Sequence, residues 1–264
     1  MSDASTPVDI TRVDADGSRR VADAVAREEP LEIRIEGRPV AITMRTPGHD
    51  LELAAGFLFT EGVIDGPDDL TAMAHVDDPS TPEGNTVDTI LASGVPAARR
   101  GAADRAMFAS SSCGVCGKAT IDRLRQRVPP LSTPIAVEDR TLMRLPEVLR
   151  AAQDVFDNTG GLHAAGLFTA SGHLEVSRED IGRHNAVDKV IGWRLNRESV
   201  PIDDRILLVS GRAGFEIIQK ALMAGISTVA AVGAPSSLAV ELARESGMRL
   251  IGFLRDGRFN QYSA

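Results

Sequence analysis

Apolar and polar residues alternate in residues 31–45, LEIRIEGRPVAITMR, on either side of Glu36 and Gly37. Such alternation around a glycine turn is typical of a β-hairpin that buries one face. Behind the hairpin, apolar residues recur at the spacing of a helix face, and Asp50 is placed to be the N-cap of that helix. Residues 86–93, TVDTILAS, are expected to form a further strand. The first part of the chain therefore predicts a small α+β unit.

The middle of the chain alternates between helical and extended patterns. GKATIDRLRQRV, residues 117–128, has the apolar spacing of a helix. A second helix is predicted over 145–161, with Pro146 in its first turn and Gly160 as its C-terminal stop. Two more elements are expected after it: a hairpin over 162–180 that turns at Ser171 and Gly172, and a helix over 181–195.

The last quarter of the chain has the clearest pattern, because short apolar runs alternate with amphipathic stretches in the order β-α-β-α-β. That order implies parallel strands joined by right-handed crossovers, so the fold class is α/β. Residues 1–25 are polar and are expected to be loosely ordered. The three strands are predicted in RILLVSG (205–211), STVAAVGA (227–234) and MRLIGFLR (248–255), and the two helices in 215–225 and 235–247.

Composition and charge narrow the classes of function. Of the 264 residues, 43% are hydrophobic and 25% charged, as in a globular protein with a substantial core. The net charge of −8 argues against nucleic acid as a partner, because no basic excess is available to displace counterions. No apolar run is long enough to span a membrane, and MSDASTPVDI lacks the features of a signal peptide, so we expect a cytoplasmic protein.

The only two cysteines lie in SSSCGVCGK, residues 110–118, immediately before the helix predicted over 117–128. A thiol at a helix N-terminus is biased toward the thiolate, and Lys118 adds positive charge nearby. We expect Cys113 to be the more exposed nucleophile and Cys116 its partner in the first helical turn. The alternative is that both are small buried apolar residues, which is uncommon for a pair in a glycine-rich loop.

Several kinds of site use such a pair. Structural zinc normally needs four ligands, and this chain has a single Cys-x-x-Cys pair with scattered histidines. Thioredoxin-like redox sites follow the first strand of a βαβ unit, which this pair does not. A nucleobase deaminase adds His-x-Glu, whereas His163 is followed two positions later by Ala165. A thiolate that carries a transferable group remains open.

Polar residues also gather where the predicted parallel strands end. Ser210, Gly211 and Arg212 follow one strand, and backbone N–H groups at such strand-to-helix turns suit phosphate. Ser236 and Ser237 follow the next strand, although both could equally be helix caps. Arg255 and Arg258 follow the third strand, so an anion site could form on this otherwise acidic chain. The polar stretch 178–192 is either a second functional cluster or a solvated helix face with ion pairs.

Six segments in order carry a resemblance to a known family: TPGHDLELAAGFLFTEGVI, SSCGVCGK, DIGRHNAVDKVIG, SGRAGFEIIQKALMAGI, APSSLAVELA and GFLRDGRFNQY. Together they resemble the formate dehydrogenase accessory sulfurtransferase family, FdhD, from about residue 28 to the C-terminus. The resemblance implies a cytidine-deaminase-like three-layer core over 106–264, carrying the Cys-x-x-Cys loop. A smaller α+β subdomain over 26–105 would precede it, behind a flexible segment over 1–25.

The resemblance also implies a function. Members act as sulfurtransferases that accept persulfide sulfur from a cysteine desulfurase and pass it to the molybdenum or tungsten bis-molybdopterin guanine dinucleotide cofactor. Formate dehydrogenase then receives the cofactor, and members are homodimers. By motif position Cys113 would bear the persulfide and Cys116 would assist.

The segment that would contact the guanine dinucleotide, with GDP as a partial mimic, comprises Phe253, Leu254, Arg255, Asp256, Gly257 and Arg258, beside Ser210, Gly211 and Arg212. Two other functions remain as alternatives. One is a cofactor-binding chaperone without sulfur transfer, and the other is a zinc deaminase that uses Cys113, Cys116 and His163.

Overall fold

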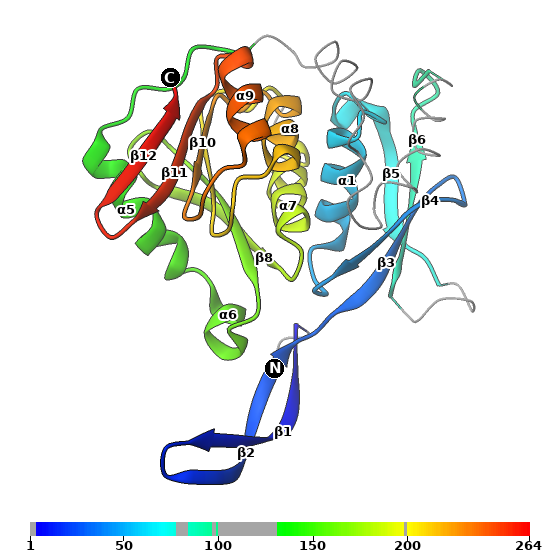
Figure 1. Cartoon of the computed structure of the whole chain (residues 1–264). Coiled ribbons are helices and arrows are strands. Elements are labelled where there is room, and N and C mark those ends of the chain that lie inside the picture. The colour runs from blue at the N-terminus through cyan, green and yellow to red at the C-terminus, as the bar shows by residue number, and fades with distance from the viewer. Residues whose placement is uncertain (1–3, 78–83, 97–98, 100–130, 198–199) are drawn as a thin grey trace.

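The computed structural model describes residues 4–77, 84–96, 99, 131–197 and 200–264 (Figure 1). The cysteine pair and the helix predicted over 117–128 lie outside these residues. The described residues form a six-stranded sheet, a four-stranded sheet and a two-stranded hairpin. Among the described helices, none combines the length and apolarity that a membrane crossing requires.

The six-stranded sheet has the strand order β12-β11-β10-β9-β7-β8. Strands β9, β10 and β11 are parallel, as the β-α-β-α-β pattern predicted. The hairpin predicted over 162–180 is confirmed as β7 and β8. Strand β12 was not predicted; it returns antiparallel to β11 through Asp256 and Gly257, whose φ values of 53° and 67° match a hairpin turn. The bounds are β7 His163–Phe168, β8 Leu174–Asp180, β9 Ile206–Val209, β10 Thr228–Ala231, β11 Arg249–Arg255 and β12 Arg258–Ser263.

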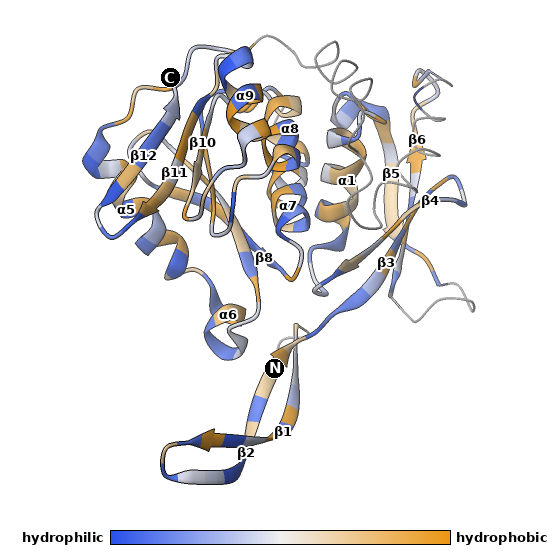
Figure 2. Ribbon diagram, in the orientation of Figure 1, coloured by the Kyte–Doolittle hydropathy of each residue, from blue (hydrophilic) through white to orange (hydrophobic). Residues whose placement is uncertain are grey.

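Helices cover both faces of this sheet, so it forms the middle of three layers. Helices α7 (Arg183–Leu195), α8 (Phe215–Met223) and α9 (Ser237–Ser246) cover one face, and α5 (Asp139–Arg150) covers the other. Alternation along the strands supplies both cores: Leu207 faces the first group of helices, and Leu208 faces α5. In Figure 2 strand β11, inside the sheet, is largely orange, hence hydrophobic, whereas the edge strand β12 is blue to grey. The α/β class is confirmed, and the likeness to cytidine deaminases stays a prediction.

The helix predicted over 145–161 is wrong in its bounds. The segment forms α5, which begins earlier at Asp139, and a short α6, Asp154–Thr159. Pro146 lies inside α5 rather than in its first turn. The helix tolerates this proline because Leu142, Leu145 and Leu149 are all buried against the sheet, and packing outweighs the lost backbone hydrogen bond. Gly160 does end α6, in the left-handed conformation that favours glycine.

The four-stranded sheet confirms the predicted N-terminal α+β unit. Its order is β4-β3-β6-β5, and the predicted hairpin and the predicted strand are all present. Asp50 was wrongly expected to be the N-cap of α1; His49 occupies that position, with φ 60°, and Asp50 is the first helical residue. Strand β5 and the 3-10 helix η1 were not predicted. The bounds are β3 Glu29–Ile35, β4 Arg38–Arg45, α1 Asp50–Thr60, η1 Pro67–Asp69, β5 Leu70–His75 and β6 Thr86–Leu91.

Helix α1 packs directly against α7, so the two larger sheets share one hydrophobic core. A Cβ atom at Gly56 would lie 1.9 Å from the carbonyl oxygen of Asp188. A Cβ atom at Gly192 would lie 1.9 Å from the carbonyl oxygen of Glu52. The helices therefore approach so closely that only glycine fits at either position.

The N-terminal segment departs from the expected loose order. It forms a regular hairpin of β1, Ser5–Asp14, and β2, Gly17–Ala26. Its polar composition hid the alternation of Val8 and Ile10 with polar residues, and Gly17 at the turn. In Figure 1 this dark blue hairpin projects away from the rest of the chain.

Candidate functional site

The segments that follow β9 and β10 meet β11 at the carboxyl edge of the sheet, as predicted. Gly233 N donates a hydrogen bond to Gly211 O (2.9 Å), and Phe253 N donates to Gly233 O (3.0 Å). Ala213 N donates to Ala234 O at 3.2 Å. These bonds hold three chain segments side by side where parallel strands end, which is where α/β sheets bind ligands.

Ser210 joins this edge to the start of β7. Its backbone N–H donates to Ala164 O (2.9 Å), and its hydroxyl accepts from Ala164 N (2.9 Å). Gly211 lies beside His163, since a Cβ atom at this glycine would be 3.2 Å from the imidazole Nδ1. The residues predicted at the strand end are thus brought to a histidine that precedes them by almost fifty positions.

The electrostatic environment of this edge is positive. The pKa of His163 is lowered, first by burial and then by the positive charges of Arg183, His184 and Arg212. Among the described residues, no carboxylate forms an ion pair with Arg183 or Arg212. Arg183 begins α7, and Arg212 lies three residues before the start of α8, so both residues lie near the positive ends of helices. This arrangement suits an anion such as phosphate. We define the edge site as Ser210, Gly211, Arg212, His163 and Arg183.

His184 is held by a carboxylate. Its Nε2 lies 2.8 Å from Glu216 Oε2, at the start of α8. The pKa of Glu216 is lowered, mainly by this hydrogen bond. Glu216 therefore fixes the imidazole between α7 and α8, and the positive charge of Arg183 also acts on its carboxylate.

A cavity of about 540 Å³ opens beside the edge site. Gln153 is only 4% exposed, and within the described residues its side-chain amide has no hydrogen-bond partner. The Arg150 guanidinium lies 4.7 Å from the centroid of the Phe156 ring, which forms another wall. A buried free amide beside apolar and aromatic walls suits a planar heterocycle with donor and acceptor edges. The lining residues are Pro146, Leu149, Arg150, Gln153, Phe156, Gly160, Gly161, Leu162, His163, Ser210 and Val232.

The segment predicted to contact a guanine nucleotide divides into two parts. Phe253 has a positive φ of 53° and lies in a bulge of β11 beside Gly233. The Leu254 side chain is fully buried against α5, so only its backbone is available to a ligand. The remaining four residues, Arg255, Asp256, Gly257 and Arg258, form the exposed end of the β11–β12 hairpin.

Of the two serines that follow β10, Ser236 has a structural role. Ser236 is the N-cap of α9, and its hydroxyl accepts a hydrogen bond from Ala239 N at 3.3 Å. This supports the capping alternative for Ser236.

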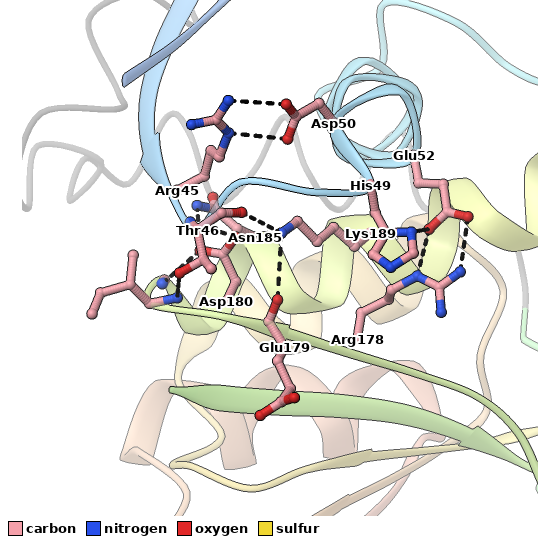
Figure 3. A network of polar contacts seen from close by, with 12 residues as sticks. Arg45, Thr46, His49, Asp50, Glu52, Arg178, Glu179, Asp180, Asn185 and Lys189 are labelled. Carbon is pink, nitrogen blue, oxygen red and sulfur yellow. Dashed lines mark hydrogen bonds and ion pairs between the residues drawn. The ribbon is translucent and has the colours of Figure 1, made fainter. Parts of the chain in front are cut away.

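Much of the polar stretch 178–192 proves to be a buried structural network (Figure 3). Lys189 Nζ lies 2.7 Å from Asp180 Oδ2 and donates to Thr46 O at 2.9 Å. Asp180 also accepts hydrogen bonds from Thr46 N (3.2 Å) and Asn185 Nδ2 (3.0 Å). The ion pair is almost completely buried, so it fastens the segment after β4 to β8 and α7.

A second buried pair joins three helices. Lys220 of α8 donates to Asp188 of α7 at 2.8 and 2.9 Å and to Thr60 of α1 at 3.0 Å. Burial acts to lower the pKa of Lys220, but the Asp188 carboxylate outweighs it and the pKa is raised. Lys220 is therefore a cation in the core, held by its carboxylate partner.

The candidate site is only partly described. Cys113 and Cys116 lie outside the described residues, so their predicted roles stay predictions. Within the described part of the chain, no three His, Cys, Asp or Glu side chains are grouped to hold a metal ion. Gln153 was not predicted as a site residue, because only the packing of α6 and β7 beside the strand ends brings it there. Arg183 was predicted only as a member of the polar stretch 178–192.

Comparisons with known proteins identify relatives of this chain. Residues 26–264 match the model of the FdhD/NarQ family. A protein from Mycolicibacterium paratuberculosis named sulfur carrier protein FdhD is 51% identical over 241 residues, covering 89% of this chain and 88% of that protein. A protein of the same name from Streptomyces avermitilis is 52% identical over 249 residues, covering 91% and 87%.

A solved structure supports the fold. It is the crystal structure of a protein from Desulfotalea psychrophila, described as a candidate formate dehydrogenase accessory protein. The TM-score is 0.77 at 24% sequence identity, and the match covers 99% of this chain and 97% of the other.

Proposed function

Because this chain belongs to the FdhD/NarQ family, we propose that it is a sulfur carrier in the maturation of formate dehydrogenase. The observation that carries the proposal is the extent of the match, since relatives named as sulfur carriers are about half identical over most of the chain. We further propose that a cysteine desulfurase is the donor and that molybdenum bis-molybdopterin guanine dinucleotide is the substrate that accepts sulfur. The reaction would take place in the cytoplasm.

Cys113 would be the sulfur-bearing residue. Its thiolate attacks the outer sulfur of the donor persulfide, and a new S–S bond forms on Cys113. The donor's S–S bond breaks, and the donor cysteine leaves as a thiolate. Electrons and atoms balance without an external oxidant, which makes the protein a sulfurtransferase by persulfide exchange. Cys116 would assist.

The edge site and its cavity offer a place for the nucleotide part of the substrate. A cavity of about 540 Å³ lies within the range of ~300–1,000 Å³ that is usual for small-molecule sites. Arg183 and Arg212 would bind phosphate oxygens, and the Gln153 amide would hydrogen-bond the edge of the guanine ring. The Arg255–Arg258 turn lies along the same side of the sheet and would bind the second phosphate. Two nucleotide arms on one substrate also suit a homodimer.

Substituting the cysteines tests the sulfur-transfer step. We expect Cys113→Ala to abolish formate dehydrogenase activity in cells that lack the native protein, while the purified variant still binds GDP. Cys116→Ala is the matched control and should retain part of the activity. If Cys113→Ala supports full activity, sulfur transfer fails and a cofactor-binding chaperone is the better account.

Metal content separates the third possibility. A zinc deaminase would need a bound metal at Cys113, Cys116 and His163. Stoichiometric zinc in the purified protein, lost in His163→Ala, would favour that enzyme over a sulfur carrier.

A further inference from the structure

The N-terminal hairpin lies outside the region that matches the family. The match begins at residue 26, whereas β1 and β2 pair over residues 5–26. Among the described residues, the hairpin packs against the body mainly at its base, where β2 contacts α6 (Figure 1). A lone two-stranded hairpin is only marginally stable in water, and three or more strands with an apolar face are usually required. The hairpin therefore has the properties of an arm that needs a partner.

The pairing register shows which backbone groups of the arm are free. Arg27 N donates to Ala4 O at 2.9 Å, and hydrogen-bonded pairs then alternate with unbonded pairs up to the turn. By this alternation Arg20, Ala22 and Ala24 direct their N–H and C=O groups away from β1. Among the described residues, no other strand pairs with either edge of the arm. Both edges are thus open to a further strand.

The two edges differ in their capacity to pair. On β1, the outward-facing positions include Pro7, which has no N–H to donate. Asp9 faces the same edge. On β2, none of the outward-facing positions is a proline, so each keeps its N–H group. The β2 edge is therefore the one suited to another strand.

We propose that the β2 edge pairs antiparallel with β2 of a second copy of this chain, about a two-fold axis at Val21. In this register Val21 lies opposite Val21 of the second copy. Arg19 lies opposite Asp23 of the second copy, and the two-fold axis repeats this charged pair on the other side of Val21. Arg19 and Asp23 form ion pairs within the arm, with Asp14 (3.4 Å) and Arg12 (3.6 Å). Their side chains are nonetheless 61% and 39% exposed, so both can reach across. Cross-strand pairs of opposite charge stabilise such a ladder.

Neighbouring registers are less favourable. An axis at Arg19 places that arginine opposite itself, and an axis at Asp23 opposes two carboxylates. An axis at Arg20 places Arg20 of one copy opposite Arg20 of the other. An axis at Ala22 places Arg19 opposite Val25, which is apolar. Charge complementarity therefore selects the register centred on Val21.

The paired arms also solve the problem of the isolated hairpin. Val21 shares a sheet face with Ile10, its partner on β1, and with Val8. Pairing of two β2 strands makes a four-stranded sheet in which these apolar side chains from both copies form one continuous face. This inference does not rest on sulfur transfer, because it concerns only residues 5–26.

Charge exchange at the interface is the first test. We expect Arg19→Asp to raise the dissociation constant of the dimer at least tenfold in sedimentation experiments on the full chain, and Arg19→Asp with Asp23→Arg to restore it. Arg12→Asp is the matched control, since it removes the 3.6 Å contact to Asp23 within the arm but lies away from the β2 edge. An unchanged dimer in Arg19→Asp, or no recovery in the double variant, would overturn the proposal.

Crosslinking tests the register itself. Val21 forms a hydrogen-bonded pair with Ile10, so across the interface it occupies an unbonded pair, where side chains are closest. In a background of Cys113→Ser and Cys116→Ser, Val21→Cys should form a disulfide-linked dimer on mild oxidation. Val13→Cys, at a position that is 73% exposed on β1, should stay monomeric under the same conditions. Equal crosslinking of both variants, or none in Val21→Cys, contradicts the Val21-centred register.

Discussion

Replacement of Gly56 by alanine tests how closely the N-terminal unit is fixed to the main sheet. The new Cβ would lie 1.9 Å from Asp188 O, which is backbone and cannot rotate away. Helices α1 and α7 would have to separate by about 1.5 Å to restore an ordinary 3.4 Å contact. That separation would strain the packing on both sides of Asp188, whose carboxylate holds Lys220.

We expect Gly56→Ala to lower the free energy of unfolding by about 3 kcal/mol, at the upper end for overpacked cores. In a chain of this length, that corresponds to a melting temperature lower by roughly 6–12 °C. Thermal and urea unfolding measure the change. Gly94→Ala is the control, because nothing lies within 4 Å of the added Cβ and it should change stability little. If Gly56→Ala melts within one or two degrees of the parent chain, the close approach of the two helices is wrong.

Three further outcomes are expected. Lys220→Met leaves Asp188 buried without its cation and should cost about 3–5 kcal/mol in urea unfolding; a cost below about 1 kcal/mol would show that the pair is not buried as described. Gln153→Leu should weaken GDP binding about tenfold in calorimetry while unfolding normally, and unchanged affinity would remove Gln153 from the nucleotide cavity. The pKa of His163 is lower in the folded chain, so the unfolded chain binds more protons below about pH 6.5, and stability falls as the pH drops through that range. His163→Gln should make this slope shallower in unfolding measured from pH 7.5 to 5.5, and an unchanged slope would contradict the partial burial of the imidazole.

The regular elements of the chain were largely predictable from short-range pattern. The hairpin of β3 and β4 and the parallel strands β9, β10 and β11 were predicted because each depends on alternation or on a short apolar run. The start of α5 was not, since the buried leucines of that helix outweigh the usual boundary signal of Pro146. The hairpin of β1 and β2 was missed because its apolar side chains are few and its composition is that of a flexible segment.

The site was predictable only where residues are close in sequence. Ser210 and Arg212 were expected at the carboxyl edge because parallel strands end together. The cavity was not expected, because Gln153 lies in the break between two helices that had been predicted as one. The polar stretch 178–192 offered two interpretations, and only the distances from Asp180 to Lys189 and from Asp188 to Lys220 show that it is largely structural.

The proposed function requires that Cys113 carry sulfur between two partners. Mass spectrometry of the intact protein after incubation with an active cysteine desulfurase and cysteine tests it most directly. Persulfide transfer predicts a gain in mass of one sulfur atom, removed by a reductant, mapped to Cys113 in peptides and absent from Cys113→Ala. No gain in mass with a donor that is active toward another acceptor, or a gain that persists in Cys113→Ala, would contradict it.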